Sequence, residues 1–417
     1  MNDNIDKYNK CYILSFACSI VDYIVDSSSS LQSYVEKYLL NILNPNDIID
    51  HQDISNYNNA IKEINTYQLG GCSLNTLRMY TYLHNIFDIN FKKIKDINTS
   101  NFKTCFICSI GDDSLSNNYI NLLKQENILC IYQKNSQSNL SSCLVNIDKQ
   151  TKDKIFYNNI STCKKLSKSF LTNVFVNINT IKFNNIEVDI NNLKYFLLDS
   201  YLIKDCFEEY LFIYNYIIKK NKFVKFVYNL ADVYFINSCF TKVDYLVNLA
   251  DIVVCNEDQI SSYIKLKSID KLSILCKDSI CNDVVSSILN IVKDITNNNT
   301  SNIKLFIITR GNKPTLSVYY SSKEFFSLTV DVNKININNI VDTNGAGDSF
   351  TAGFLFALDY YNDSNNINKD IINKDLLTKC INFGHSIAEL SLLNKGFSIE
   401  KNNLNLYIKT INKLINN

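Results

Sequence analysis

Short apolar runs alternate with longer amphipathic segments along most of the 417 residues. The apolar runs have the length of buried strands, and they lie at 11–16, 102–110, 194–200, 222–230, 251–256 and 303–311. The segments between them place apolar residues at helical spacing, most clearly at 72–83, 205–220 and 345–358. This alternation predicts βαβ units, and therefore a doubly wound α/β fold with a mostly parallel sheet covered on both faces.

Two segments interrupt this rhythm, because they mix short extended runs with polar loops. They lie at 17–66 and 128–157, and we interpret them as a small β lid inserted into one α/β domain that spans 1–417. A hairpin is expected after residue 311, formed by "TLSVYY" and "KEFFSLTV". Asn-rich tracts at 297–299, 333–339 and 362–369 are too polar for a core and predict surface insertions.

The charge balance disfavours some classes of protein. There are 42 basic and 41 acidic side chains, whereas a nucleic-acid-binding protein normally carries a basic excess. The first ten residues mix both charges, Asp22 breaks the apolar stretch that follows, and no run of about 20 uncharged apolar residues occurs. We therefore expect no nucleic-acid partner, no signal peptide, no transmembrane helix and a cytoplasmic location.

Fourteen cysteines fall mostly singly within apolar runs, which predicts buried thiols rather than a disulfide framework. Cys105 and Cys108 form a CxxC pair, but this pair lies in a strand-like run and no second pair accompanies it. The chain has three histidines, so a metal centre built from several histidines is not expected.

The most informative stretch is "VDTNGAGDSF" at 341–350, where a polar loop leads into an amphipathic helix. Gly345, Ala346 and Gly347 have little or no side chain, so their backbone N–H groups can approach an anion at the helix N-terminus. Asp348 follows in the first turn, where a carboxylate beside a bound phosphate is placed to take a proton from an attacking hydroxyl. The pattern favours phosphoryl transfer, with an anion hole and a general base.

Two other interpretations of this stretch remain open at this point. A helix dipole by itself favours Asp in the first turn, so Gly-Ala-Gly could simply form a tight turn. A dinucleotide-binding turn is the second alternative, and it would imply an oxidoreductase. It fits less well, because Phe350 occupies the place of the third Gly and the motif does not follow the first strand.

The stretch "DTNGAGDSFTAGFL" resembles the signature of the ribokinase, or PfkB-type carbohydrate kinase, family, and in particular its adenosine kinase branch. A second stretch, "GGCSLNTLR" at 70–78, is similar to another signature of that branch. The resemblance implies a ribokinase-like fold with a β lid and transfer of the γ-phosphoryl of Mg-ATP to the 5′-hydroxyl of a nucleoside. ATP and Mg²⁺ would be the cofactors, Asp348 the base, and the protein a monomer or homodimer.

The same resemblance implies roles for individual residues along the chain. The acceptor would be bound by Asp22, Gly70, Gly71, Asn75 and Lys154. The Gly-Gly turn would let backbone approach the sugar, and Asn75 can both donate to and accept from its hydroxyls. Mg²⁺ would be held mainly through water, near Asn256 and Gln259. The residues expected to bind ATP are Asn229, Asn256, Thr309, Gly311, Asn344, Gly384 and His385.

The sequence departs from the family pattern at three places. Ala17-Cys18 stand where the branch has Gly-Asn, and a thiol is a weak hydrogen-bond partner for ribose. Gln259 replaces a Glu, keeping its shape and losing its charge, while Ser141-Ser142 replace a Gly-Thr pair. A kinase for another sugar or nucleoside, or a catalytically weak scaffold member, therefore stays an alternative to an adenosine kinase.

Overall fold

The computed structural model describes most of the chain, with gaps. The described residues are 11–26, 67–92, 102–147, 154–272, 303–365, 372–399 and 403–416, with the isolated positions 61, 64, 287, 288, 290 and 291 and without 177, 178, 185 and 323. Within these residues the strands form a large sheet, a smaller sheet and a separate two-stranded hairpin.

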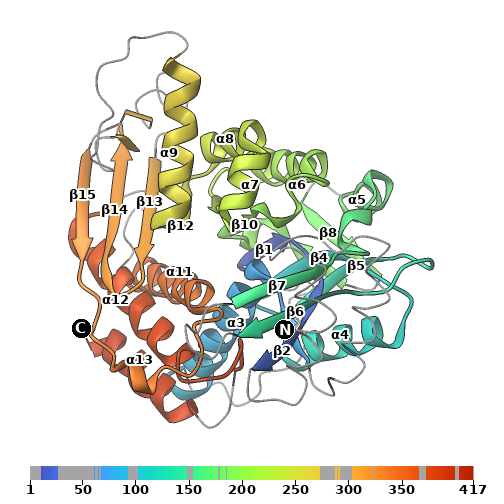
Figure 1. Ribbon diagram of the computed structural model, residues 1–417, viewed down its shortest axis with the longest axis horizontal. Helices are drawn as coiled ribbons and strands as arrows, with labels where there is room; N and C mark the ends of the chain where they lie inside the picture. Colours follow the sequence, from blue (N-terminus) through green and yellow to red (C-terminus); the bar gives the residue numbers. More distant parts are fainter. Residues whose placement is uncertain are drawn as a thin grey trace, which may run out of the picture.

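The large sheet has nine described strands in the order β15-β14-β13-β12-β11-β10-β1-β4-β5 (Figure 1). The strands from β13 to β5 in this order run parallel, whereas β14 and β15 form an antiparallel hairpin at one edge. This confirms the predicted parallel sheet and the hairpin after residue 311. The strand bounds are β1 (Ile13–Phe16), β4 (Thr104–Ile110), β5 (Leu129–Lys134), β10 (Tyr195–Asp199), β11 (Lys225–Asn229), β12 (Ile252–Asn256), β13 (Ile303–Arg310), β14 (Lys313–Ser321) and β15 (Phe325–Val330).

Helices cover both faces of this sheet, so its central strands are buried on both sides. Neighbouring residues such as Ile13 and Leu14 belong to two different core clusters, one on each face. One face carries α3 (Cys72–Asn90), α4 (Ser114–Gln125), α11 (Ala346–Asn365), α12 (Lys374–Ser391) and α13 (Leu404–Asn416). The other carries α5 (Lys168–Val174), α6 (Phe207–Lys220), α7 (Val233–Ser238), α8 (Phe240–Leu249) and α9 (Glu257–Leu272).

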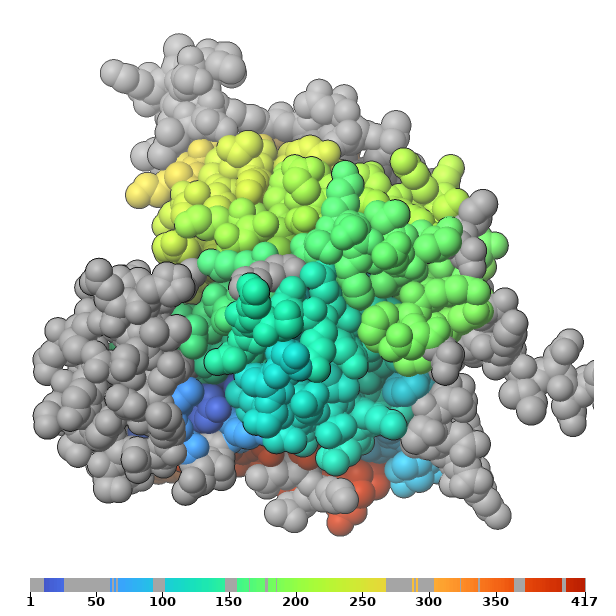
Figure 2. Space-filling model, turned by 90° about the vertical axis from the view of Figure 1, so that its right-hand side faces the viewer, coloured from blue at the N-terminus to red at the C-terminus, as the bar shows by residue number. Residues whose placement is uncertain are grey.

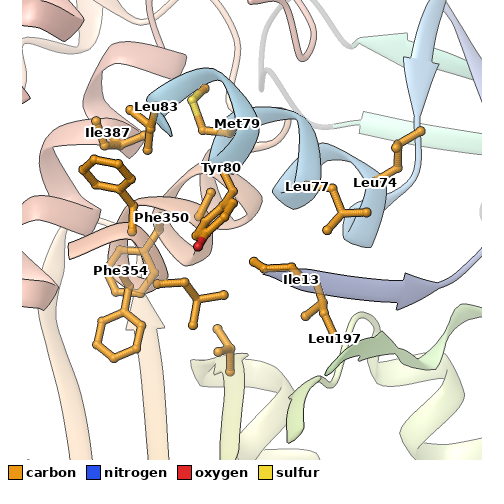
Figure 3. Packing of buried hydrophobic residues seen from close by; sticks show 14 of the residues in the cluster. Ile13, Leu74, Leu77, Met79, Tyr80, Leu83, Leu197, Phe350, Phe354 and Ile387 are labelled. Carbon is orange, nitrogen blue, oxygen red and sulfur yellow. The ribbon is translucent and has the colours of Figure 1, made fainter. Parts of the chain in front are cut away.

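Helices α3 and α11 pack together, and this contact positions the site described below. Tyr80 and Leu83 of α3 lie against Phe350 and Phe354 of α11 in one apolar cluster (Figure 3). The spacing of these residues is helical, as the sequence predicts for both segments. The packing brings the N-terminal turns of the two helices to the same edge of the sheet.

The smaller sheet has four described strands in the order β3-β2-β6-β7. Its members are β2 (Ile20–Asp26), β3 (Gln68–Gly70), β6 (Ser141–Ile147) and β7 (Lys154–Asn159). This separate sheet fits the predicted lid. In Figure 2 the cyan to green segments around α4, β6 and β7 occupy the middle of one face, with the yellow-green helices above them.

The bounds of the lid differ from those expected from sequence. The expected range 128–157 includes β5, which pairs with β4 in the large sheet. β5 alternates buried and half-buried residues because it is an edge strand, and this mixed pattern resembles that of a lid strand. β3 lies beyond the expected range 17–66, and 27–60 of that range lie outside the described residues.

Short elements complete the described chain. An unpredicted hairpin is formed by β8 (Thr180–Phe183) and β9 (Ile186–Asp189). Single turns of 3₁₀-helix are η2 (Cys163–Lys165), η3 (Ile190–Asn192), η4 (Ser200–Leu202) and η5 (Ile337–Asn339). Among the described helices, none combines the length and the apolar character needed to cross a membrane.

The cysteine prediction is wrong for one pair, because Cys18 and Cys163 form a disulfide. Cys18 lies between β1 and β2, and Cys163 begins η2, just after β7. The two positions are 145 residues apart in sequence, so only the folded arrangement brings them together. Cys105 and Cys108, the CxxC pair, are both free and buried in β4.

Candidate active site

A cavity of about 400 Å³ lies between the two sheets, where the parallel strands β10, β11, β12 and β13 end. The carboxyl ends of parallel strands are the usual place for a ligand in open α/β sheets. The start of α3 and the start of α11 also reach this cavity. Its polar lining includes Asp22, Cys72, Asn75, Asp199, Asn229, Asp232, Asn256, Gln259, Thr309, Asn344 and Asp348.

The first turn of α11 presents backbone amides to the cavity. Gly345 has φ +73°, and an added Cβ there would overlap the ring of Phe397. A Cβ at Gly347 would meet no atom within 4 Å, so this residue borders open space in the cavity. Among the described residues, the N–H groups of Gly347 and Asp348 have no acceptor, while Ala346 N–H has one long bond of 3.4 Å to Thr343 O. Two helix N-terminal amides are therefore available to an anion.

Asp348 lies in the same turn, and its carboxylate is held by α3. The Cys72 thiol donates to Asp348 Oδ1 at 2.8 Å, and Asn75 Nδ2 donates to Oδ2 at 3.0 Å. Burial raises the pKa of Asp348 to about 6, although both hydrogen bonds oppose this rise and the nearby charge of Asp199 adds to it. Above that pH the group is a carboxylate poised to accept a proton.

Four of the five residues expected to bind the acceptor lie near the first turn of α3. Asp22 of β2 lines the cavity, and a Cβ at Gly70 on the paired strand β3 would overlap its carboxylate. Gly71 has φ +100°, a conformation that favours glycine, and it precedes α3. Asn75 also lines the cavity. Lys154 begins β7, and its side chain lies outside the described part of the chain.

The residues expected near the phosphates and Mg²⁺ lie at the ends of β12 and β13. The side chains of Asn256 and Gln259 each accept from the other's backbone N–H at 2.9 Å, and Gln259 Nε2 donates to Ala231 O. Thr309 lines the cavity and donates to Cys255 O at 3.3 Å. Gly311 has φ +61° and does not line the cavity, and a Cβ there would meet no atom within 4 Å. Asn256 thus caps the N-terminus of α9, and the amide of Gln259 completes this capping box and holds the chain after β11.

The remaining expected nucleotide residues fall in different places. Asn344 lines the cavity, and Asn229 donates through Nδ2 to Cys72 Sγ at 3.2 Å, on the α3 side. Gly384 and His385 do not border the cavity. Gly384 packs closely on Phe350, and His385 Nε2 lies 2.8 Å from Thr315 Oγ1, in a setting where burial lowers the pKa of the imidazole to about 4.

Cys72 and Asp199 are cavity residues that the sequence analysis does not single out, and both make polar contacts at the start of α3. Cys72 contacts Asp348, as described, and Asp199 ends β10 as a buried carboxylate. An acidic residue at the end of the apolar run 194–200 is a signal that could have indicated Asp199, since strand ends meet at the site. Cys72 carried no such signal. No group of three or more histidine, cysteine, aspartate or glutamate side chains able to hold a metal occurs among the described residues.

Solved structures of similar fold include adenosine kinases and a probable sugar kinase. An adenosine kinase from Schistosoma mansoni in complex with 2-fluoroadenosine has 19% identity and a TM-score of 0.69, over 94% of this chain and 98% of that one. An Anopheles gambiae adenosine kinase has 16% identity and a TM-score of 0.67, over 92% and 96%. A probable sugar kinase from Rhizobium etli has 14% identity and a TM-score of 0.66, over 97% and 99%.

These likenesses show a shared fold, since the identities are low. The sequence itself shows the family. Residues 43–402, which are most of the chain, match the family described as "pfkB family carbohydrate kinase". That match includes both the Gly-Gly turn before α3 and the Gly-Ala-Gly-Asp turn of α11. The chain belongs to the pfkB family of carbohydrate kinases.

Proposed function

We propose that this kinase transfers the γ-phosphoryl of ATP to the 5′-hydroxyl of a nucleoside, with adenosine as the first candidate. The observation that carries the proposal is the first turn of α11. Its two amides without acceptors and the Asp348 carboxylate, whose pKa is raised to about 6, face one cavity. An anion site beside a base is the arrangement that phosphoryl transfer to an alcohol requires.

The lining of the cavity supports a nucleoside rather than a free sugar. Asp22 and Asn75 offer polar groups to sugar hydroxyls, whereas Phe156, Tyr201 and Phe235 provide aromatic surface nearby. A flat base can stack on such surface, while its sugar is held by the polar groups. The adenosine kinases of similar fold are consistent with this acceptor class.

In the proposed reaction Asp348 takes the proton of the hydroxyl as its oxygen forms a bond to the γ-phosphorus. The bond from that phosphorus to the β,γ-bridging oxygen breaks, and ADP leaves with the electron pair. The amides of Gly347 and Asp348 would stabilise the charge on the moving phosphoryl group. Closing the lid over the acceptor would exclude water from the transfer.

The nucleotide is proposed to lie along the ends of β12 and β13, near Asn256, Thr309 and Asn344. Mg²⁺, when bound, would be held mainly through water near Asn256 and Gln259, and it would supply positive charge to offset that of the phosphates. The residues present fit an ion surrounded by water, because Gln259 carries no charge and its amide already holds Asn256 and Ala231. The nearby turn at Gly311 does not line the cavity, but a Cβ there would meet no atom within 4 Å.

One observation favours a second candidate, a kinase for another sugar or nucleoside. Cys18 lines the cavity where the adenosine kinase branch has Asn, and its sulfur is bonded to Cys163. A disulfide sulfur donates no hydrogen bond, so one ribose contact of the branch is missing here.

The experiment that separates these candidates is a coupled assay of ATP consumption with a panel of nucleosides and sugars. We expect Mg-ATP-dependent turnover with adenosine. Turnover with other alcohols alone would move the assignment to the second candidate. Binding of ATP without turnover of any alcohol would contradict the kinase proposal and favour a scaffold role.

A further inference from the structure

The N-terminus of α3 is capped by a residue from another element. Gly71 precedes the helix and has no side chain to cap it. Instead, Asp199 of β10 accepts from Ser73 N at 3.1 Å and from Ser73 Oγ at 2.6 Å, both through Oδ2. A carboxylate at this position satisfies a free helix amide and interacts favourably with the helix dipole.

The same helical turn holds the Asp348 carboxylate. Cys72 and Asn75, on either side of Ser73, donate to the two oxygens of Asp348. One turn of α3 therefore lies between two buried carboxylates, with Asp199 on the β10 side and Asp348 on the α11 side. Asn229 of β11 adds a further contact to this turn through Cys72 Sγ.

The hydrogen bonds of Asp199 are directed into the protein, although the residue borders the cavity. Its Oδ1 accepts from Tyr201 N at 3.0 Å, its Oδ2 accepts the two bonds from Ser73, and the residue is 1% exposed. A direct ligand would present an unused polar atom to the cavity. This pattern instead fits a residue that fixes its neighbours.

We propose, resting on the function proposed above, that Asp199 is a positioning residue for phosphoryl transfer. It fixes the first turn of α3, so that Cys72 and Asn75 hold the Asp348 carboxylate toward the acceptor hydroxyl. The residue acts through α3 and does not itself contact the substrate. Misplacement of a reacting group by about 1 Å can cost on the order of 10²-fold in rate.

The test uses Asp199→Asn, which keeps the size of the side chain but replaces the carboxylate with an uncharged amide. The donors of Ser73 then face either an NH₂ group or a neutral oxygen. We expect kcat to fall on the order of 10²-fold while the KM for ATP stays unchanged. In an Asp348→Asn background, the same substitution should cause no further loss, because the two residues act in one chain of contacts. A full additional loss in that background would overturn the proposal.

A second variant and a control guard against general effects on folding. Ser73→Ala removes only the Ser73 Oγ bond to Asp199 and should reduce kcat in the same direction by a smaller factor. Asp189→Asn is the matched control, because Asp189 caps η3 by accepting from Asn191 N at 2.9 Å and does not line the cavity. Its kcat should equal that of the wild type. Unchanged kcat in both Asp199→Asn and Ser73→Ala would contradict a positioning role.

Amide hydrogen exchange provides a readout that does not depend on activity. Asp199→Asn should speed exchange of the Ser73 amide in the unliganded protein, and Asp189→Asn should not. Unchanged exchange at Ser73 would overturn the inference even if turnover fell. Absence of turnover in the wild type would defeat the proposed function, while the exchange result would still decide whether Asp199 holds this turn.

Discussion

At the scale of the residue, Asp348 is unusual because it is buried and, within the described chain, no cationic side chain pairs with it. Hydrogen bonds from a thiol and an amide stabilise its charge only in part, so burial dominates and the pKa rises to about 6. A stronger partner such as Arg would lower the pKa and make the carboxylate a weaker base. The surroundings thus favour proton transfer near neutral pH.

The first prediction concerns the pH dependence of catalysis. Because the base must be ionised, kcat/KM for the acceptor should rise with pH and level off above an apparent pKa near 6. Steady-state rates from pH 4.5 to pH 8 at saturating Mg-ATP measure it. A rate that is flat across this range would contradict the assignment of Asp348 as base.

The second prediction concerns stability. The folded-state pKa of Asp348 is raised from 3.8 to about 6, so its contribution to stability is fully present below pH 3.8 and is lost as pH rises through 6. Asp348→Asn removes this dependence. As the pH rises through this range, the unfolding free energy of the wild type should fall by about 3 kcal/mol relative to that of the variant. Urea unfolding of both proteins at pH 3.5 and pH 7 tests it, and parallel curves would contradict it.

The third prediction separates function from folding at Gly347. An added Cβ meets nothing within 4 Å, so Gly347→Ala should leave the Tm within about a degree of the wild type. The methyl group would nevertheless occupy the space offered to the phosphate, and kcat/KM for ATP should fall by at least about tenfold. Gly345→Ala is the contrasting variant, because its Cβ would overlap Phe397 and should lower the Tm. Normal activity in Gly347→Ala would contradict the proposed anion site.

At the scale of the element, the disulfide joins two connections between the lid and the large sheet. Cys18 lies between β1 and β2, and Cys163 follows β7, while Ser141 Oγ at the start of β6 lies 3.0 Å from Cys163 Sγ. Three crossings from the lid to the sheet therefore meet at one point. Such a cross-link limits the conformations of the unfolded chain and the movement of the lid.

The fourth prediction follows from this cross-link, which spans 145 residues. Reduction should lower the unfolding free energy by about 2–5 kcal/mol, because a loop of this length gains much conformational freedom. Denaturant unfolding with and without dithiothreitol measures the change. The Cys18→Ser/Cys163→Ser protein is the control and should not respond to the reductant. A wild type that is equally insensitive would show that the cross-link does not form in solution.

The sequence predicted the elements unevenly, for physical reasons. The central strands and helices α3, α6 and α11 follow from apolar runs and helical spacing, which depend on local sequence. The sequence places β5 in the lid because an edge strand shows the same mixed pattern of buried and half-buried residues as a lid strand. The hairpin of β8 and β9 was missed because its strands are short and their burial depends on neighbours from α5 and β5.

At the scale of the whole molecule, the sequence predicts those parts of the site that lie within a recognisable motif. The Gly-Gly turn and the Gly-Ala-Gly-Asp turn lie far apart in the chain, yet both lead into helices whose N-terminal turns border the same cavity. The roles of Asp199 and Cys72 could not be predicted this way, because Asp199 meets Ser73 across 126 residues and Cys72 meets Asp348 across 276. Only the packing of β10, α3 and α11 makes those contacts.

The central claim is that Asp348 accepts a proton from an alcohol as phosphate is transferred. The most direct measurement compares ADP and AMP formation from Mg-ATP and adenosine by the wild type and Asp348→Asn, with the Tm of each protein as a control for folding. We predict that the wild type forms both products and that the variant, still folded, has a kcat lower by about 10²–10⁴-fold. Turnover by folded Asp348→Asn at the wild-type rate would contradict the account.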